Sequence, residues 1–420
     1  MRFFKVAILF FLVNFCSELV AQDLSYARDV IDSLCSPSMH GRGYVLEGET
    51  KAAVFIGEEF NRWNLKPFAD DYYQEYLVSV NTFPEDMLLS INGEELEAGK
   101  DFIVSPSSRS QSGSFKATHL KEQKILNRGS FNKLMLNKSF TDEVVVFDYE
   151  GENAVKARER AKLFIGSHLD AAAFISVEEK LTWHTASSVD NFTHIQISRD
   201  AMPSKVKEVG INIDASFQTT YQTQNVVGYI KGRTYPDSLY VFTAHYDHLG
   251  RLGANHYIPG ANDNASGVAM LLNLAKYYSQ NPPAYSIAFI AFGAEELGLI
   301  GSKHFVENPL FPLDKIKFLV NLDIVGTGEE GITAVNALQF PEAFARLANI
   351  NESKGYLPQI KKRGEAANSD HWFFYTHHVP CFFIYTLGGI QAYHDVYDRP
   401  ETLPLTEFED LMRLLVDFCK

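Results

Sequence analysis

The stretch YVFTAHYDHLG, residues 240–250, begins as an apolar run and ends in polar side chains. The apolar part predicts a buried strand, and the two-residue period of a strand places His245 and Asp247 on the same side of its end. Ligands of open α/β sheets gather at strand ends. A neutral imidazole is a good zinc ligand, and a nearby carboxylate can accept its other ring N–H. A polar surface loop would explain the same residues, and we interpret His248 as a bystander.

The residues around this stretch alternate between predicted strands and helices. Strands are predicted at 225–230, 239–244, 285–292, 317–324, 332–336 and 381–385. Helices are predicted at 266–279, 341–352, 370–376 and 406–418. This alternation indicates an α/β layered fold.

The first half of the chain has two further patterns. Apolar positions recur at helical spacing over residues 26–63, with a break at 40–43, which predicts two helices joined by a loop. From about 84 the chain changes to short alternating runs, such as 143–148 and 162–165, separated by Gly, Ser and Asn. We therefore predict a β-rich domain at 84–224, inserted between residues 22–83 and 225–420 of the α/β domain.

The N-terminus predicts export. Arg2 and Lys5 precede an apolar run from Val6 to Val13, which is far shorter than the roughly 20 residues of a membrane-spanning helix. We assign residues 1–21 to a signal peptide. The mature protein is then expected in the periplasm or secreted, without stable insertion in a membrane.

The charge of the chain bears on its possible partners, and its cysteines bear on disulfides and metal sites. The net charge of the chain is −14, and removal of Arg2, Lys5 and Glu18 with the signal peptide leaves −15. Such an excess of negative charge disfavours nucleic acid as a partner. The cysteines that remain are Cys35, Cys381 and Cys419. They allow at most one disulfide and have no metal-site spacing.

Several carboxylates follow predicted strands or turns. Asp263 lies in a turn rich in Gly and Asn before the helix at 266, where it could equally be a helix cap. Glu295 and Glu296 follow the buried strand at 285–292, and adjacent carboxylates there are costly unless they are paired, metal-bound or solvated. Asp323 lies among apolar residues at a strand end, where a cation or an ion-pair partner would compensate its charge.

A last candidate comes from the loop GGIQAYHDVYDRPETL, which starts at Gly388 and contains Tyr393 and His394. One histidine in a loop is weak evidence, but the candidates together form a set of two histidines and three carboxylates. Such a set suits two divalent ions with one bridging carboxylate, and zinc is the leading cation. The five are His245, Asp263, Glu296, Asp323 and His394.

The order of these motifs resembles that of the secreted dizinc aminopeptidases related to bacterial leucyl aminopeptidase, aminopeptidase S and plasma glutamate carboxypeptidase. The shared order is His-x-Asp, an Asp-Asn turn before a helix, Glu-Glu, an Asp at a strand end and a late His. The resemblance implies the three-layer α/β/α fold of zinc exopeptidases with a central mixed sheet, and two zinc ions per chain. It implies that Asp263 bridges the ions, that His245 and Asp323 complete one site, and that Glu296 and His394 complete the other.

The resemblance also implies roles for neighbouring residues. Asp247 would orient His245, Glu295 would be the general base, and Tyr393 would donate a hydrogen bond to the developing oxyanion. The run Ser369–His371 matches a recurrent Ser-Asp-His that supports the site by hydrogen bonds. The insertion resembles a protease-associated domain by its position and its β-rich pattern.

The implied activity is hydrolysis of the N-terminal peptide bond of peptides. Carboxypeptidases and dipeptidases of the same family use the same metals and stay open as alternatives. Glutaminyl cyclases use one zinc and receptor-like relatives lose metal ligands, so the complete ligand set disfavours both. The resemblance further suggests a cis peptide bond between Asp263 and Asn264. The preferred side chain of the substrate and the oligomeric state do not follow from the sequence.

Overall fold

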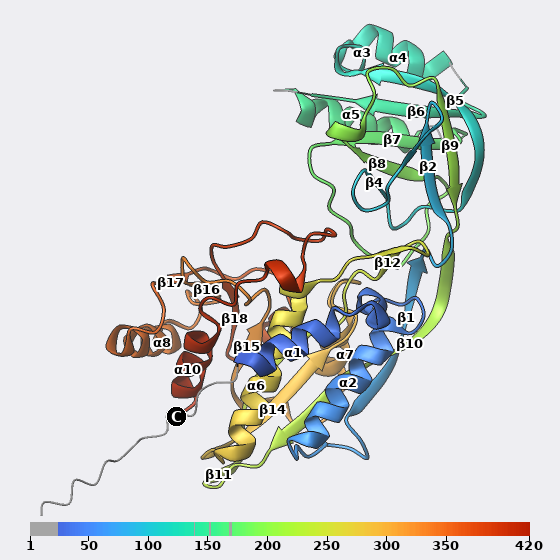
Figure 1. Ribbon diagram of the computed structural model, residues 1–420. Coiled ribbons are helices and arrows are strands. Elements are labelled where there is room, and N and C mark those ends of the chain that lie inside the picture. The colour runs from blue at the N-terminus through green and yellow to red at the C-terminus, as the bar shows by residue number, and fades with distance from the viewer. Residues whose placement is uncertain (1–23, 138, 151–152, 168–169) are drawn as a thin grey trace, which may run out of the picture.

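The structure is a computed structural model that describes residues 24–137, 139–150, 153–167 and 170–420. The predicted signal peptide at residues 1–21 lies outside these ranges. The described chain forms two eight-stranded sheets, each with its own helices, and Figure 1 shows the sheet of β2–β9 above the sheet that contains β14.

The first sheet is mixed, and its middle is parallel. Its strands lie in the order β1 (Tyr73–Thr82), β10 (Ser216–Ile230), β14 (Tyr285–Phe292), β11 (Tyr235–His245), β15 (Ile316–Leu322), β18 (Cys381–Thr386), β16 (Ile332–Val335) and β17 (Ile360–Lys362). Strands β14, β11, β15 and β18 are parallel neighbours. Their carboxyl ends therefore meet at one edge of the sheet.

Helices cover both faces of this sheet. One core joins the sheet to α1 (Leu24–Leu34), α2 (Gly48–Arg62), α6 (Ser266–Gln280), α8 (Pro341–Lys354) and α10 (Phe408–Phe418). A second core joins the other face to α7 (Ile300–Glu307) and α9 (His371–Thr376). Along β11, Tyr240 and Phe242 face the first core while Leu239 and Val241 face the second, which explains the continuous apolar run of a strand buried on both faces. The predicted three-layer α/β/α fold is confirmed.

The second sheet has the order β3 (Glu94–Leu96), β2 (Met87–Ile91), β9 (Glu208–Ile213), β5 (Gln111–Lys121), β6 (Glu143–Asp148), β7 (Ala173–Glu178), β8 (His194–Ser198) and β4 (Phe102–Val104). Strands β5 to β8 are parallel. The helices of this unit are α3 (Glu122–Leu126), α4 (Arg128–Asn137) and α5 (Ala154–Ile165). A further small hairpin, β12 (Arg251–Leu252) with β13 (His256–Tyr257), follows β11.

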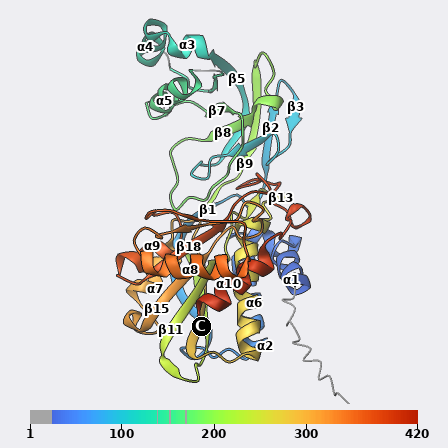
Figure 2. The same ribbon diagram turned by 90° about the vertical axis from the view of Figure 1, so that its left-hand side faces the viewer.

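The strand predicted at 162–165 is wrong, because these residues end α5. Ala157, Ala161 and Phe164 recur at helical spacing and pack in an aromatic-rich core. A run of four residues is too short to show that period. Strands β1 and β10 pair with each other and link the two sheets, as Figure 1 shows. Figure 2 shows the two units from the side. No helix within the described ranges is long and apolar enough to cross a membrane.

The three described cysteines are free. Cys35, Cys381 and Cys419 are buried and form no disulfide with one another. Burial raises the pKa of each thiol to about 12, so all three are protonated at neutral pH. They pack in the two cores as small apolar side chains.

Candidate metal centre

The candidate ligands meet at the carboxyl edge of the parallel strands. His245 is the last residue of β11, Asp323 directly follows β15, and Glu295 and Glu296 lie in the loop after β14. Asp263 lies in the turn Ala261–Ala265 that opens α6. Ligand atoms from these residues lie within 4.8 Å of one another in overlapping groups of three.

Asp263 lies between the two predicted histidine ligands. Its Oδ1 is 3.3 Å from His245 Nε2, and its Oδ2 is 2.9 Å from His394 Nε2. Each histidine has a second carboxylate close by: Asp323 Oδ1 lies 3.4 Å from His245 Nε2, and Glu296 Oε2 lies 3.3 Å from His394 Nε2. One carboxylate thus faces two separate pairs of ligands with its two oxygens, which is the arrangement of a bridging ligand.

Three of these four separations fit ligand atoms around a metal ion, and the fourth, 2.9 Å between His394 Nε2 and Asp263 Oδ2, is shorter. Zinc bonds to nitrogen and oxygen are about 2.0–2.2 Å long, so ligand atoms around a tetrahedral zinc lie roughly 3.3–3.6 Å apart. Asp323 Oδ1 is buried and has no hydrogen-bond partner among the described residues, although a buried carboxylate oxygen is normally satisfied. His394 Nδ1 lies 3.0 Å from the main-chain oxygen of Trp183, which makes Nδ1 the donor and leaves Nε2 free to bind a metal. The residues present therefore fit a pair of divalent cations.

The carboxylates around the two histidines favour a positive charge at this place. Burial lowers the pKa of His394, but Glu296 and Asp263 outweigh burial and raise the pKa to about 11. Burial likewise opposes a charge on His245, whereas Glu295 and Asp323 raise its pKa well above the usual range. The site therefore attracts positive charge strongly.

Asp247 contacts both the loop of the two glutamates and His245. Its Oδ1 and Oδ2 accept hydrogen bonds from the backbone N–H groups of Glu295 and Glu296, at 3.0 and 3.2 Å. His245 Nδ1 lies 3.2 Å from the main-chain oxygen of Asp247 and 3.7 Å from its carboxylate. The Asp247 side chain thus mainly fixes the loop of the two glutamates, while its main chain orients the imidazole.

Glu295 and Tyr393 line the cavity above the ligands. This cavity measures about 250 Å³ and also contacts Ile324, Arg363, Asn368, Phe383 and Tyr385. The Tyr393 ring stacks on the His394 ring with 4.0 Å between centroids. Burial, together with the charge of Glu296, raises the pKa of Glu295 well above its usual range.

Ser369 and the peptide bond after Asp263 are both expected to support the candidate ligands. Ser369 Oγ donates a hydrogen bond to Asp323 Oδ2 at 2.7 Å and accepts one from Asn321 at 2.7 Å, so the support predicted for the Ser-Asp-His run is confirmed at Ser369. The peptide bond between Asp263 and Asn264 is cis, as expected.

His248 contradicts its interpretation as a bystander. Its side chain is fully buried, and Nδ1 lies 2.9 Å from Glu296 Oε1. Burial keeps the pKa of His248 below its usual value despite the nearby glutamate, so the ring is neutral and Nδ1 donates. Glu296 Oε1 is thereby held while Oε2 faces His394. No sequence signal distinguishes this histidine from a surface residue.

The second unit also reaches the centre, through residues 180–185 between β7 and β8. Trp183 N donates to the main-chain oxygen of His394 at 2.9 Å, in addition to the bond from the His394 ring. Thr185 Oγ1 donates to the main-chain oxygen of Glu296 at 2.5 Å. These contacts join residues more than a hundred positions apart, and nothing local in the sequence indicates them.

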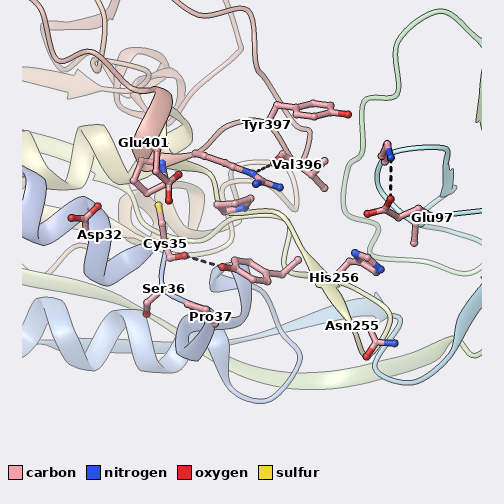
Figure 3. A pocket seen from close by; sticks show the side chains of 16 residues that line it. Asp32, Cys35, Ser36, Pro37, Glu97, Asn255, His256, Val396, Tyr397 and Glu401 are labelled. Atoms are coloured by element: carbon pink, nitrogen blue, oxygen red, sulfur yellow. Dashed lines mark hydrogen bonds and ion pairs between the residues drawn. The ribbon is translucent and has the colours of Figure 1, made fainter. Parts of the chain in front are cut away.

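A larger cavity of about 720 Å³ lies away from the ligands, against residues 396–401 (Figure 3). Three of its charged side chains have partners within the protein. Lys100 pairs with Glu97 at 3.2 Å, and Arg399 Nε donates to the main-chain oxygen of Val396 at 2.6 Å. The metal centre and this cavity are therefore distinct features.

A cluster of histidines and carboxylates at the strand ends of a three-layer α/β/α sandwich is typical of the zinc-exopeptidase class of folds. The sequence comparison agrees with that class. Residues 225–419 match the model of peptidase family M28. This part of the chain is therefore similar to the peptidases of that family.

Relatives agree with the assignment. Aminopeptidase YwaD of Bacillus subtilis is 43% identical over 115 residues, which cover 27% of this chain and 24% of that protein. A probable zinc metalloprotease of Pyricularia oryzae is 39% identical over 111 residues, 26% of this chain and 22% of that protein. The matched segment thus spans about a quarter of the length of these relatives.

Solved structures share the fold over nearly the whole chain. The zinc aminopeptidase BSAP from Bacillus subtilis has a TM-score of 0.68 at 20% identity, covering 94% of this chain and 93% of that one. A peptidase M28 precursor from Shewanella amazonensis has a TM-score of 0.68 at 16% identity, with 94% and 92% covered. Both units therefore have counterparts in known structures of this fold.

Proposed function

We propose that the protein is an exported zinc aminopeptidase that hydrolyses the N-terminal peptide bond of peptides. The observation that carries this proposal is the position of Asp263, whose two oxygens face two separate histidine and carboxylate pairs. Relatives named as an aminopeptidase and as zinc metalloproteases support the choice of zinc and of peptide substrates. Export rests on the signal peptide predicted for residues 1–21.

We assign two zinc ions to the centre. His245 and Asp323 would hold one, Glu296 and His394 the other, and Asp263 would bridge them. The chemistry supplied by bound zinc is the acidification of a water molecule and the polarisation of the scissile carbonyl.

Glu295 is the proposed general base. It lines the same cavity as the ligands without being needed as one of the five. Its raised pKa suits a group that takes a proton from water and returns it to the leaving amine near neutral pH. Tyr393, fixed by its stacking on His394, can donate its hydroxyl hydrogen to the oxyanion that forms on the substrate.

The test combines metal content with substrate choice. We expect two zinc ions per chain and hydrolysis of leucine p-nitroanilide, but not of its N-acetylated form. Glu295→Gln should keep both ions and lose about 10²- to 10⁴-fold in kcat, while Glu342→Gln, on the exposed side of α8, should match the wild type. Activity only on N-blocked peptides, a single zinc, or an active Glu295→Gln protein would contradict the proposal.

A further inference from the structure

Arg363 brings a guanidinium group to the cavity above the metal ligands. The residue directly follows β17, at the edge of the first sheet. Its backbone N–H donates to the Ala334 oxygen at 3.0 Å, and its own oxygen accepts from Leu338 N at 3.4 Å. The base of this side chain is thus fixed by strand-like pairing, whereas its charged end is free to meet a ligand.

The charge of Arg363 has no counterion within the part of the chain that the structure describes. Its Nη1 lies 3.5 Å from the Tyr385 hydroxyl, which is a weak and neutral contact. The nearby Glu365 interacts with Tyr375 instead. Some arginines of the molecule do have such a partner, for example Arg199 with Asp148 at 2.6 Å and Arg413 with Asp410 at 2.8 Å.

Apolar and aromatic side chains line the same cavity as Arg363, beside the polar ligand cluster. Phe383 and Tyr385 lie two residues apart on β18 and therefore on the same face, with 5.4 Å between ring centroids. Ile324 also lines the cavity. A short carbon chain can pack against these groups, and an anionic end can reach the guanidinium. A cationic end would meet repulsion.

We propose that Arg363 binds a carboxylate of the substrate, so that the preferred peptides carry a carboxylate within about one residue of the scissile bond. This inference rests on the proposed peptidase function. With two divalent ions bound, the ligand carboxylates and Glu295 are balanced in charge, and Arg363 remains as the unpaired positive group. A guanidinium presents paired N–H donors that match the two oxygens of a carboxylate.

Two sources can supply that carboxylate. It can be the side chain of an acidic N-terminal residue, or the C-terminal carboxylate of a dipeptide. Three substrates separate them: Glu-Ala-amide carries only the first, Leu-Ala carries only the second, and Leu-Ala-amide carries neither. Release of the N-terminal amino acid is measured for each.

The variants are Arg363→Met and the matched control Lys362→Met, which removes the same charge from an exposed neighbour on β17. We expect Arg363→Met to lower kcat/KM about 10-fold for the substrates whose carboxylate is bound. The value for Leu-Ala-amide should stay within twofold, zinc content should not change, and Lys362→Met should resemble the wild type. Loss confined to Glu-Ala-amide identifies an acidic N-terminal residue, and loss confined to Leu-Ala identifies a dipeptide.

Binding is measured separately from turnover in the Glu295→Gln background. Calorimetry should show about 10-fold weaker binding of the carboxylate substrate after Arg363→Met, with no change for Leu-Ala-amide. If Arg363→Met changes kcat/KM or binding equally for all three substrates, or for none of them, Arg363 does not bind a substrate carboxylate. Failure of the wild type to hydrolyse any of the three would instead refute the proposed peptidase function.

Discussion

Replacing His248 by leucine should weaken zinc binding at the site of Glu296 and His394. His248 donates from Nδ1 to Glu296 Oε1 at 2.9 Å and is fully buried. Leucine has a comparable volume but no donor, so the oxygen would lose its partner in a place that water does not reach. The Glu296 carboxylate would then be free to turn away from His394.

The size of the effect follows from the kind of hydrogen bond. A hydrogen bond to a charged group contributes about 1.5–3 kcal/mol. At 1.4 kcal/mol for each factor of ten, its loss weakens binding roughly 10- to 150-fold. The range agrees with the 10- to 100-fold typical of residues that orient metal ligands.

The assay is a titration of metal-free protein with zinc in competition with a chromogenic chelator. His248→Asn should recover most of the affinity, because the asparagine amide can place a donor near the position of Nδ1. His256→Leu, in the cavity of Figure 3, is the control and should bind zinc like the wild type. Thermal unfolding in chelator shows whether each variant folds without metal. Wild-type affinity in His248→Leu, or an equal loss in His248→Asn, would refute the reasoning.

Two further outcomes are expected. The surrounding carboxylates raise the pKa of His245 well above its usual range and that of His394 to about 11, so both imidazoles hold a proton at neutral pH when no cation is bound. Zinc binding should therefore release about two protons, and its affinity should increase as the pH rises from 6 to 8. Binding heats that do not depend on the ionisation enthalpy of the buffer, measured by calorimetry, would contradict this. Thr185→Val removes the hydroxyl that donates to the main-chain oxygen of Glu296 and should weaken zinc binding about fivefold. The control variant Thr376→Val, on the exposed end of α9, should bind zinc like the wild type. Both affinities are measured by the same competition with a chelator.

The sequence predicts the ligands that directly follow strands, for a physical reason. A strand buried on both faces is an apolar run, and a carboxylate or imidazole directly after it stands out, as at His245 and Asp323. Parallel pairing then brings these ends to one edge, so local signals suffice to predict a shared site. The end of α5 shows the limit, because four apolar and basic residues carry no usable period.

Local sequence patterns do not predict most of the contacts that support the ligands. Asp247 forms hydrogen bonds to the glutamate loop after another strand, and His248 contacts a carboxylate 48 residues away. Arg363 comes from an exposed strand end whose sequence resembles any basic surface segment. These roles depend on which strands become neighbours in the sheet. The sequence of a single strand does not determine which strands lie next to it.

The position of His394 explains why the second unit matters to the centre. Residues 387–399 form neither helix nor strand, so the backbone around this ligand lacks the ladder of hydrogen bonds that fixes His245 at the end of β11. Trp183 supplies a substitute through its reciprocal bonds with His394, and Lys180 adds contacts with Gln391 and Asp395 at 3.0 and 3.4 Å. A segment between two strands of the second sheet thus holds a ligand of the first. The predicted insertion therefore contacts the candidate metal centre, and its own folding is physically coupled to the geometry around His394.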